Sequence, residues 1–163
     1  MLDKWKTEWF TRRVQELKNP MYGLAIGILR NQEDAEDAIQ NALILAYEHM
    51  DDLSMLEKFK PWMMRILANE CYRIIKKRKF YTDIDETYDI ADEKIAFEEQ
   101  VTLWEVVQNL KEEYRTVIVL FYYEGMSIRE ISGILEISED NVKKRLSRAR
   151  SKLKAFLEKE ELS

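Results

Sequence analysis

The sequence predicts an all-α fold made of two small helical domains. Hydrophobic residues make up 46% of the 163 positions, which is enough to build buried cores. Only four glycines and two prolines interrupt the chain, and apolar residues recur at helical spacing rather than in alternating runs. Residues 81–103 hold eight acidic residues and one lysine, with few strong core positions. We therefore predict one helical domain over 1–80, an acidic linker over 81–100 and a second helical domain over 101–163. The alternative is one continuous bundle with a polar surface loop.

The net charge and the rarest residue types restrict the classes of function. A net charge of −5 argues against a protein that coats nucleic acid by bulk charge, so any DNA binding must come from local patches. The single cysteine, Cys71, excludes an internal disulfide and a thiolate zinc site, and the single histidine, His49, excludes a multi-histidine metal site. We therefore expect no enzyme activity and no cofactor. Because we find neither a signal peptide nor an apolar run long enough to span a membrane, we expect a cytoplasmic protein without membrane insertion.

The first domain is predicted to contain four helices. Pro20 disfavours helix at the residue before it, so Asn19 and Pro20 should separate the first two. Asn31 is a suitable N-cap for the third helix, with Asp34 three residues on in a capping-box-like arrangement. Pro61 suits the first turn of the fourth. The predicted ranges are 3–17, 20–29, 31–50 and 61–79, with a loop over 51–60.

The third predicted helix has two contrasting faces. We expect an apolar stripe to be buried, and it consists of Ala35, Ala38, Ile39, Ala42, Leu45, Ala46 and Met50. The other face is mostly polar and consists of Glu33, Asp37, Gln40, Asn41 and Ile44. Both sets follow the spacing of a helix, so the second should remain open to a partner.

The fourth predicted helix combines cations, an amide and an aromatic ring on its outer face. These residues are Arg65, Asn69, Tyr72, Lys76 and Lys79, and Phe59 and Trp62 precede or begin the helix. Aromatic rings beside a basic track suit unstacked bases and a single-stranded backbone. The alternative is that Phe59, Trp62 and Tyr72 are ordinary core or half-buried residues.

The second domain is predicted to end in a helix-turn-helix. Two helices over 101–109 and 111–123 come first, and Gly125 suits a left-handed cap after the second. Residues 127–150 then read as two helices joined by a tight turn, with Ser138 as the N-cap of the second. That second helix has an apolar stripe of Val142, Leu146, Ala149 and Leu153, and no acid lies between Lys143 and Lys154. An apolar-backed basic helix after a tight turn is typical of an element that enters the DNA major groove. The alternative is a plain helical hairpin with a solvated basic face.

Taken together, these segments resemble the extracytoplasmic-function group of bacterial RNA polymerase sigma factors. The resemblance covers about residues 10–158. Residues 31–43 resemble the polymerase-binding helix of that family, residues 59–69 its promoter-melting and −10-reading helix, and residues 110–131 the segment that leads into its −35-reading helix-turn-helix.

The resemblance implies roles for particular residues. Core polymerase binding would involve Glu33, Asp37, Gln40 and Ile44. The single-stranded −10 element would meet Phe59, Trp62, Arg65, Asn69, Tyr72 and Lys76, while the loop over 51–60 would hold a flipped-out base. The duplex −35 element would meet Asn141, Lys144, Arg145 and Arg148. The implied partners are core RNA polymerase and promoter DNA, and an anti-sigma factor is a further candidate partner.

Two positions depart from the family pattern, and two other functions compete with it. Arg73 stands where the family often has aspartate, and Glu136 stands in the turn where it usually has glycine. A non-glycine residue there is strained if the turn is left-handed. The first rival is a stand-alone repressor or activator whose first domain dimerises or senses a ligand. The second is a polymerase-binding regulator without promoter specificity.

Overall fold

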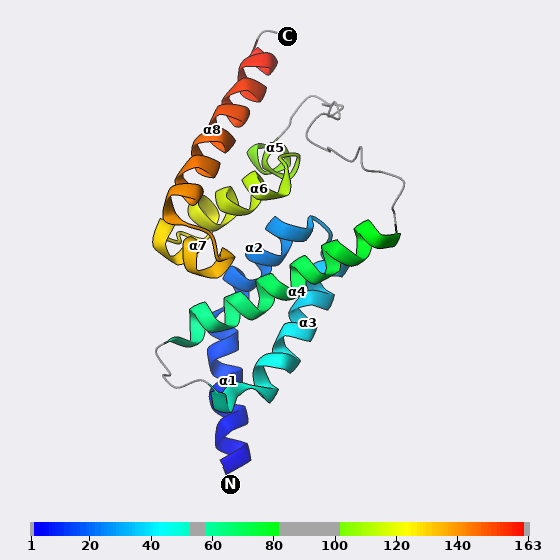
Figure 1. Ribbon diagram of the computed structural model, residues 1–163, viewed down its shortest axis with the longest axis vertical. Helices are drawn as coiled ribbons and strands as arrows, with labels where there is room; N and C mark the ends of the chain where they lie inside the picture. Colours follow the sequence, from blue (N-terminus) through cyan, green and yellow to red (C-terminus); the bar gives the residue numbers. More distant parts are fainter. Residues whose placement is uncertain (1, 53–57, 82–101, 162–163) are drawn as a thin grey trace.

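The computed structural model describes residues 2–52, 58–81 and 102–161, and these ranges form helices joined by short turns (Figure 1). The all-α prediction is confirmed within them. Most of the predicted acidic linker, residues 82–100, and positions 53–57 of the predicted loop lie outside the described residues. In chain order the elements are α1 (Leu2–Glu16), α2 (Lys18–Leu29), α3 (Gln32–Glu48), the short 3-10 helix η1 (Met50–Asp52), α4 (Phe59–Tyr81), α5 (Leu103–Gln108), α6 (Glu112–Ile118), the π-helical turn η4 (Val119–Tyr123), α7 (Ile128–Leu135) and α8 (Glu139–Glu161).

The prolines lie inside helices rather than at their boundaries, which corrects two predicted ends. α2 already begins at Lys18, so Pro20 is its third residue, and the break falls at the buried Leu17. α4 begins at Phe59, two residues before Pro61. The first turn of a helix tolerates proline because its N–H groups have no partner within the helix. The predicted cap of α3 is confirmed, since the Asp34 N–H donates to Asn31 Oδ1 over 2.9 Å.

The predicted helix-turn-helix is present. Its first helix, α7, is capped by Ser127 and Glu130, each side chain accepting the other residue's backbone N–H. The turn contains Glu136 at φ 57°, the left-handed conformation that glycine adopts without strain. Ser138 caps α8 by accepting the Asn141 N–H over 3.0 Å. Before this motif, Gly125 has φ 66° and is left-handed as predicted.

The two predicted domains share one buried core in this structure. α2 packs against α6 and η4, and α4 packs against α7. At the centre of this junction lies Arg115 on α6, only 5% exposed. Its guanidinium donates from Nε to the Gly27 carbonyl over 2.6 Å and from Nη2 to the Ile28 carbonyl over 3.0 Å. Burial lowers the pKa of Arg115 to about 10, which leaves it charged at neutral pH.

Candidate functional site

The predicted partner-binding face of α3 is exposed along its length. Glu33, Asp37 and Gln40 all face solvent, and the Ile44 side chain ends the same strip at 58% exposed. The opposite face of α3 carries four fully buried alanines, Ala35, Ala38, Ala42 and Ala46, which allow α2 and α4 to approach closely. The strip is therefore acidic at one end and apolar at the other. Such a surface suits a protein partner that offers cations beside an apolar patch.

The start of α4 belongs to an aromatic cluster, and this corrects the expectation for Phe59. Phe59 is 1% exposed, with ring centroids 5.3 Å from Trp9 and 5.9 Å from Phe10 of α1. Its ring fills the core because α4 starts at Phe59 and α1 packs over that first turn. Phe59 therefore offers no surface to a base in this structure. Trp62, 5.9 Å from Phe59, is only half-buried and forms the outer edge of the cluster.

Trp62 and Asn69 come together at a shallow cavity between α3 and α4. The cavity has a volume of about 320 Å³ and is lined by Leu45, His49, Trp62, Ile66, Asn69 and Glu70. Asn69 is exposed at its rim, and Lys76 is exposed nearly two turns further along α4. An aromatic face beside an amide is a combination that stacks on and hydrogen-bonds to an unpaired base.

The other two residues predicted on this face, Arg65 and Tyr72, contact the second half of the chain. Arg65 Nε donates to the Gly133 carbonyl over 3.3 Å, and the Tyr72 hydroxyl donates to Glu112 Oε1 over 3.0 Å. Burial and the neighbouring Glu112 raise the pKa of Tyr72 above its usual value. The sequence gives no signal for these contacts, because both partners lie far along the chain.

The basic helix α8 presents its predicted DNA face to solvent. Val142, Leu146 and Ala149 are buried against α6 and α7, while Lys144 and Arg148 are exposed. The half-buried Asn141 and Arg145 form a pair, since Arg145 Nε donates to Asn141 Oδ1 over 3.2 Å. This bond holds the guanidinium on the first two turns of the helix.

Two cations further along α8 contact tyrosines of the same half of the chain. Lys152 Nζ lies 5.4 Å from the centroid of the Tyr114 ring, and Arg150 Nη1 donates to the Tyr122 hydroxyl over 2.8 Å. Lys144 and Arg148, near the start of α8, make no such aromatic contact with the described residues and are exposed.

Comparison with known proteins identifies both halves. The family model described as Sigma-70 region 2 matches residues 13–81, and the model described as Sigma-70, region 4 matches residues 100–153. The ECF RNA polymerase sigma factor SigW of Bacillus subtilis is 32% identical over 165 residues, covering 91% of this chain and 88% of SigW. The chain belongs to the ECF sigma factors. RNA polymerase sigma factor SigV of the same organism is 29% identical and covers 92% of each chain.

Two solved structures have the same fold as this ECF sigma factor. Bartonella quintana RpoE, solved in complex with the anti-sigma factor NepR, matches with a TM-score of 0.73 at 24% identity, covering 91% of this chain and 96% of that one. CnrH, solved in complex with the cytosolic domain of CnrY, matches with a TM-score of 0.65 at 23% identity, covering 93% of this chain and 89% of that one. As a member of the family shown by the region 2 and region 4 matches and by SigW, the chain is a transcription initiation factor that directs RNA polymerase to promoters.

The described residues of this sigma factor provide neither a metal-binding cluster nor a membrane-spanning helix. In the ranges 2–52, 58–81 and 102–161, no group of three or more His, Cys, Asp or Glu side chains is placed to hold a metal ion. Within the same ranges, no helix is long and apolar enough to cross a membrane. The lone Cys71 is fully buried, and burial, followed by Glu70 and Glu112, raises the pKa of its thiol to about 12.

Proposed function

We propose that three separate surfaces divide the work of this sigma factor. The exposed strip of α3, formed by Glu33, Asp37, Gln40 and Ile44, binds core RNA polymerase. The outer face of α4 holds the melted −10 strand, and the first turns of α8 read the duplex −35 element. The division between region 2 over residues 1–80 and region 4 over 101–163 is part of this proposal.

The observation that carries the proposal is the arrangement of α8. Its apolar stripe docks on α6 and α7 behind a capped turn, and Lys144 and Arg148 are exposed on the remaining surface. Arginine bonded to guanine O6 and N7 is the commonest specific base contact in the major groove. Arg145, positioned by Asn141, is suited to this contact, while Lys144 and Arg148 are placed to meet phosphates or base edges.

For the −10 element, the proposal relies on the cavity beside Trp62 and Asn69. A half-exposed tryptophan supplies a stacking surface, and the exposed asparagine supplies a donor and an acceptor for a base edge. Lys76 adds a cation on the same side of the helix. Arg65 and Tyr72 join this surface once their present partners on the second half are displaced.

The cellular setting is also proposed. Because RpoE of Bartonella quintana was solved with an anti-sigma factor, we propose that an anti-sigma factor is a partner of this chain too. We further propose that the protein acts in the cytoplasm and is not an enzyme.

Pull-down of core polymerase, followed by run-off transcription over a promoter library, tests the division of surfaces. Asp37→Lys reverses a charge in the middle of the α3 strip and is expected to abolish core binding without a change in helicity. Glu8→Lys makes the same change at an exposed position of α1 and serves as the control. Equal recovery of core polymerase by both variants would refute the role of the strip. If the wild-type chain bound one DNA operator tightly without polymerase, it would be a stand-alone repressor or activator. If it bound core polymerase but gave no promoter-selective transcripts, it would be a polymerase-binding regulator without promoter specificity.

A further inference from the structure

Glu70 is a buried carboxylate in the wall of the cavity that also contains Trp62 and Asn69. Its side chain is only 8% exposed, whereas glutamates are mostly found on protein surfaces. Within the part of the chain that the structure describes, no other acidic residue is buried. A buried charge is unfavourable unless it is paired and hydrogen-bonded, so this carboxylate needs partners.

The chain supplies a counter-charge to Glu70 but not a full set of hydrogen bonds. Arg73, three residues further along α4, places Nη2 2.9 Å from Glu70 Oε2, and the Arg73 side chain is itself 60% exposed. The contact is an ion pair without hydrogen-bond geometry, and Oε2 accepts no hydrogen bond from the described residues. An ionised carboxylate has about four acceptor positions, so one ion pair leaves most of them open to a donor that enters the cavity.

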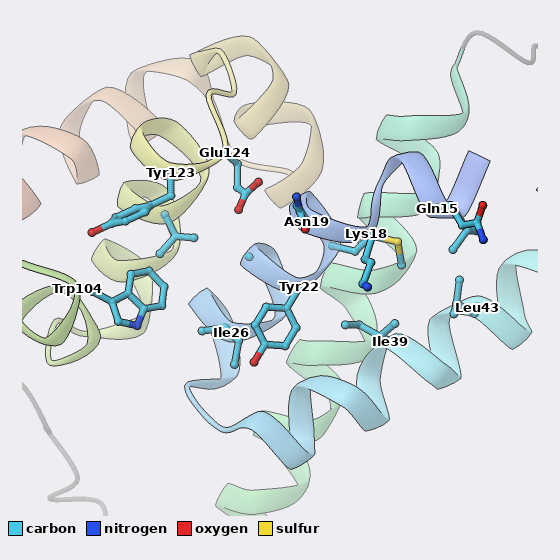
Figure 2. Close-up of a pocket in the computed structure, with 14 residues that line it drawn as sticks. Gln15, Lys18, Asn19, Tyr22, Ile26, Ile39, Leu43, Trp104, Tyr123 and Glu124 are labelled. Carbon is cyan, nitrogen blue, oxygen red and sulfur yellow. The ribbon is translucent and has the colours of Figure 1, made fainter. Parts of the chain in front are cut away.

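The larger cavity, between the two halves of the chain, has no comparable group. It has a volume of about 740 Å³, and Figure 2 shows Tyr22 on one side of it and Trp104 and Tyr123 on the other. The charged and amide side chains that line it are all exposed or half-buried, namely Gln15, Lys18, Asn19 and Glu124. Water can satisfy such groups, so they impose no fixed requirement on a ligand.

The wall of the smaller cavity favours one kind of nucleobase edge. A carboxylate only accepts hydrogen bonds, whereas the Asn69 amide both donates and accepts. Adenine, cytosine and guanine each carry an exocyclic amino group that can donate to Glu70, and glutamate accepting from cytosine N4 is a known form of base contact. Thymine has no amino group, and its single ring N–H lies between two carbonyl oxygens that a carboxylate repels.

We propose that Glu70 is a specificity-determining residue of the −10 site, where it accepts a hydrogen bond from the exocyclic amino group of an unpaired base in this cavity. The inference rests on the proposed function of the outer face of α4. Trp62 stacks on the ring of the base and Asn69 bonds to its edge, while Arg73 offsets the repulsion between the carboxylate and the DNA phosphates. The −10 position that enters the cavity therefore excludes thymine.

Binding of the holoenzyme to partly unpaired promoter DNA tests this base preference. The DNA takes its duplex −35 part from a promoter that the wild-type holoenzyme transcribes, and its fluorescein-labelled −10 strand is unpaired. Each of the four bases is placed in turn at each unpaired position. At one position, we expect wild-type holoenzyme to bind thymine about tenfold more weakly than the preferred amino-bearing base. Glu70→Gln should largely remove this penalty, because its amide can turn an NH₂ group toward a thymine oxygen.

Arg73→Met is the matched control, since it removes the ion pair but keeps the carboxylate. It should weaken binding to every DNA variant by a similar factor and leave the base preference intact. If the ion pair served only to stabilise α4, Glu70→Gln would show the same uniform effect as Arg73→Met. A thymine penalty that persists in Glu70→Gln, or a wild-type holoenzyme without such a penalty at any position, would overturn the proposal.

Removal of a single amino group from the DNA tests the same contact from the other side. Pyrimidin-2-one lacks only the amino group of cytosine, purine that of adenine and hypoxanthine that of guanine. At the selective position, the matching analogue should weaken wild-type binding about tenfold and leave binding by Glu70→Met unchanged, because methionine offers no comparable acceptor. Equal losses in both proteins, with helicity matched by circular dichroism, would show that another group meets the amine.

Two further variants separate failure of this inference from failure of the proposed function. Trp62→Ala and Asn69→Ala should each weaken binding of the unpaired strand, since the proposed function places that strand on their side of α4. If they do so while no base preference depends on Glu70, the −10 site stands and the role of Glu70 is refuted. If neither affects binding, the strand does not lie on this face and the proposed function itself fails.

Discussion

The Arg115 side chain is the most informative position for testing the energetics of the junction. The last four carbonyls of a helix have no partner within it. In α2 these belong to Ile26, Gly27, Ile28 and Leu29, and each accepts a hydrogen bond from an arginine. The Arg115 side chain donates to the Gly27 carbonyl over 2.6 Å and to the Ile28 carbonyl over 3.0 Å. The Arg30 backbone N–H donates to Ile26 over 2.8 Å, and the Arg78 side chain donates to Leu29 over 3.4 Å. Arg115 therefore supplies two of the four bonds. Its positive charge is also attracted to the negative end of the helix dipole.

Arg115→Met removes the charge and all three side-chain donations, to the Gly27, Ile28 and Leu110 carbonyls, while keeping a long apolar stem. Each orphaned, buried carbonyl costs about 1–3 kcal/mol, and relief from burying a charge offsets part of that loss. We therefore expect unfolding free energy to fall by about 3 kcal/mol, which corresponds to about 6–12 °C in Tm for a chain of this size.

Chemical and thermal unfolding followed by circular dichroism measure this loss. Arg115→Lys retains the charge but lacks the planar fork that reaches two carbonyls, so its loss should be smaller. Arg150→Met removes an exposed guanidinium from α8 and should change stability by no more than about 0.5 kcal/mol. A loss below about 1 kcal/mol for Arg115→Met would refute the reasoning, because it would mean that water satisfies the carbonyls equally well.

Three further predictions concern single positions. Cys71 should resist alkylation in the native protein and react fully in urea, because burial raises its pKa to about 12; rapid native labelling would contradict this. Glu136→Gly should raise the unfolding free energy by about 0.5–1 kcal/mol, because glycine relieves the left-handed strain and only the weak, exposed Arg65–Glu136 ion pair is lost. A lower Tm in thermal melts would show that the ion pair contributes more than the strain costs. Arg145→Ala should relax base preference at one or two −35 positions, whereas Lys144→Ala should weaken transcription from all promoters alike. Transcription over single-base −35 variants measures this. An equal loss at every variant for both substitutions would mean that Arg145 contacts the DNA phosphate backbone and not a base.

Local rules predicted the helices and their caps well, because those features depend on neighbouring residues. Asn31 and Ser138 cap as their side chains require, and the alanine stripe of α3 is buried as its spacing indicates. The left-handed turn at Glu136 was also foreseeable, since the resemblance indicated a position that usually holds glycine. The predicted starts of the two helices near proline were less accurate. Proline fits several positions in the first turn of a helix, so it does not mark the first residue.

Contacts between distant segments could not be read from the sequence. Phe59 looked like an accessible aromatic because it precedes a basic helix, and only the packing of Trp9 and Phe10 against it shows that it belongs to the core. The sequence gives no sign that Arg115 bonds to the end of α2, because the two segments lie far apart in the chain. Sequence periodicity identifies which face of a helix is buried, but it does not name the partner that covers a polar face.

The junction between the halves combines a shared apolar core with the polar contacts of Arg115, and these two parts respond differently when the halves separate. Parting α2 from α3 and α4 would expose leucine, methionine and alanine side chains that are fully buried. Parting α2 from α6 and η4 would likewise expose buried apolar side chains, among them Val117, Ile118 and Leu120, together with a guanidinium and carbonyls that water solvates readily. In Arg115→Met, the orphaned Gly27 and Ile28 carbonyls regain hydrogen bonds with water once the halves part, whereas the Leu110 carbonyl lies in the same half as Arg115. The part of the stability loss that comes from the Gly27 and Ile28 carbonyls therefore cannot exceed the free energy that holds the halves together.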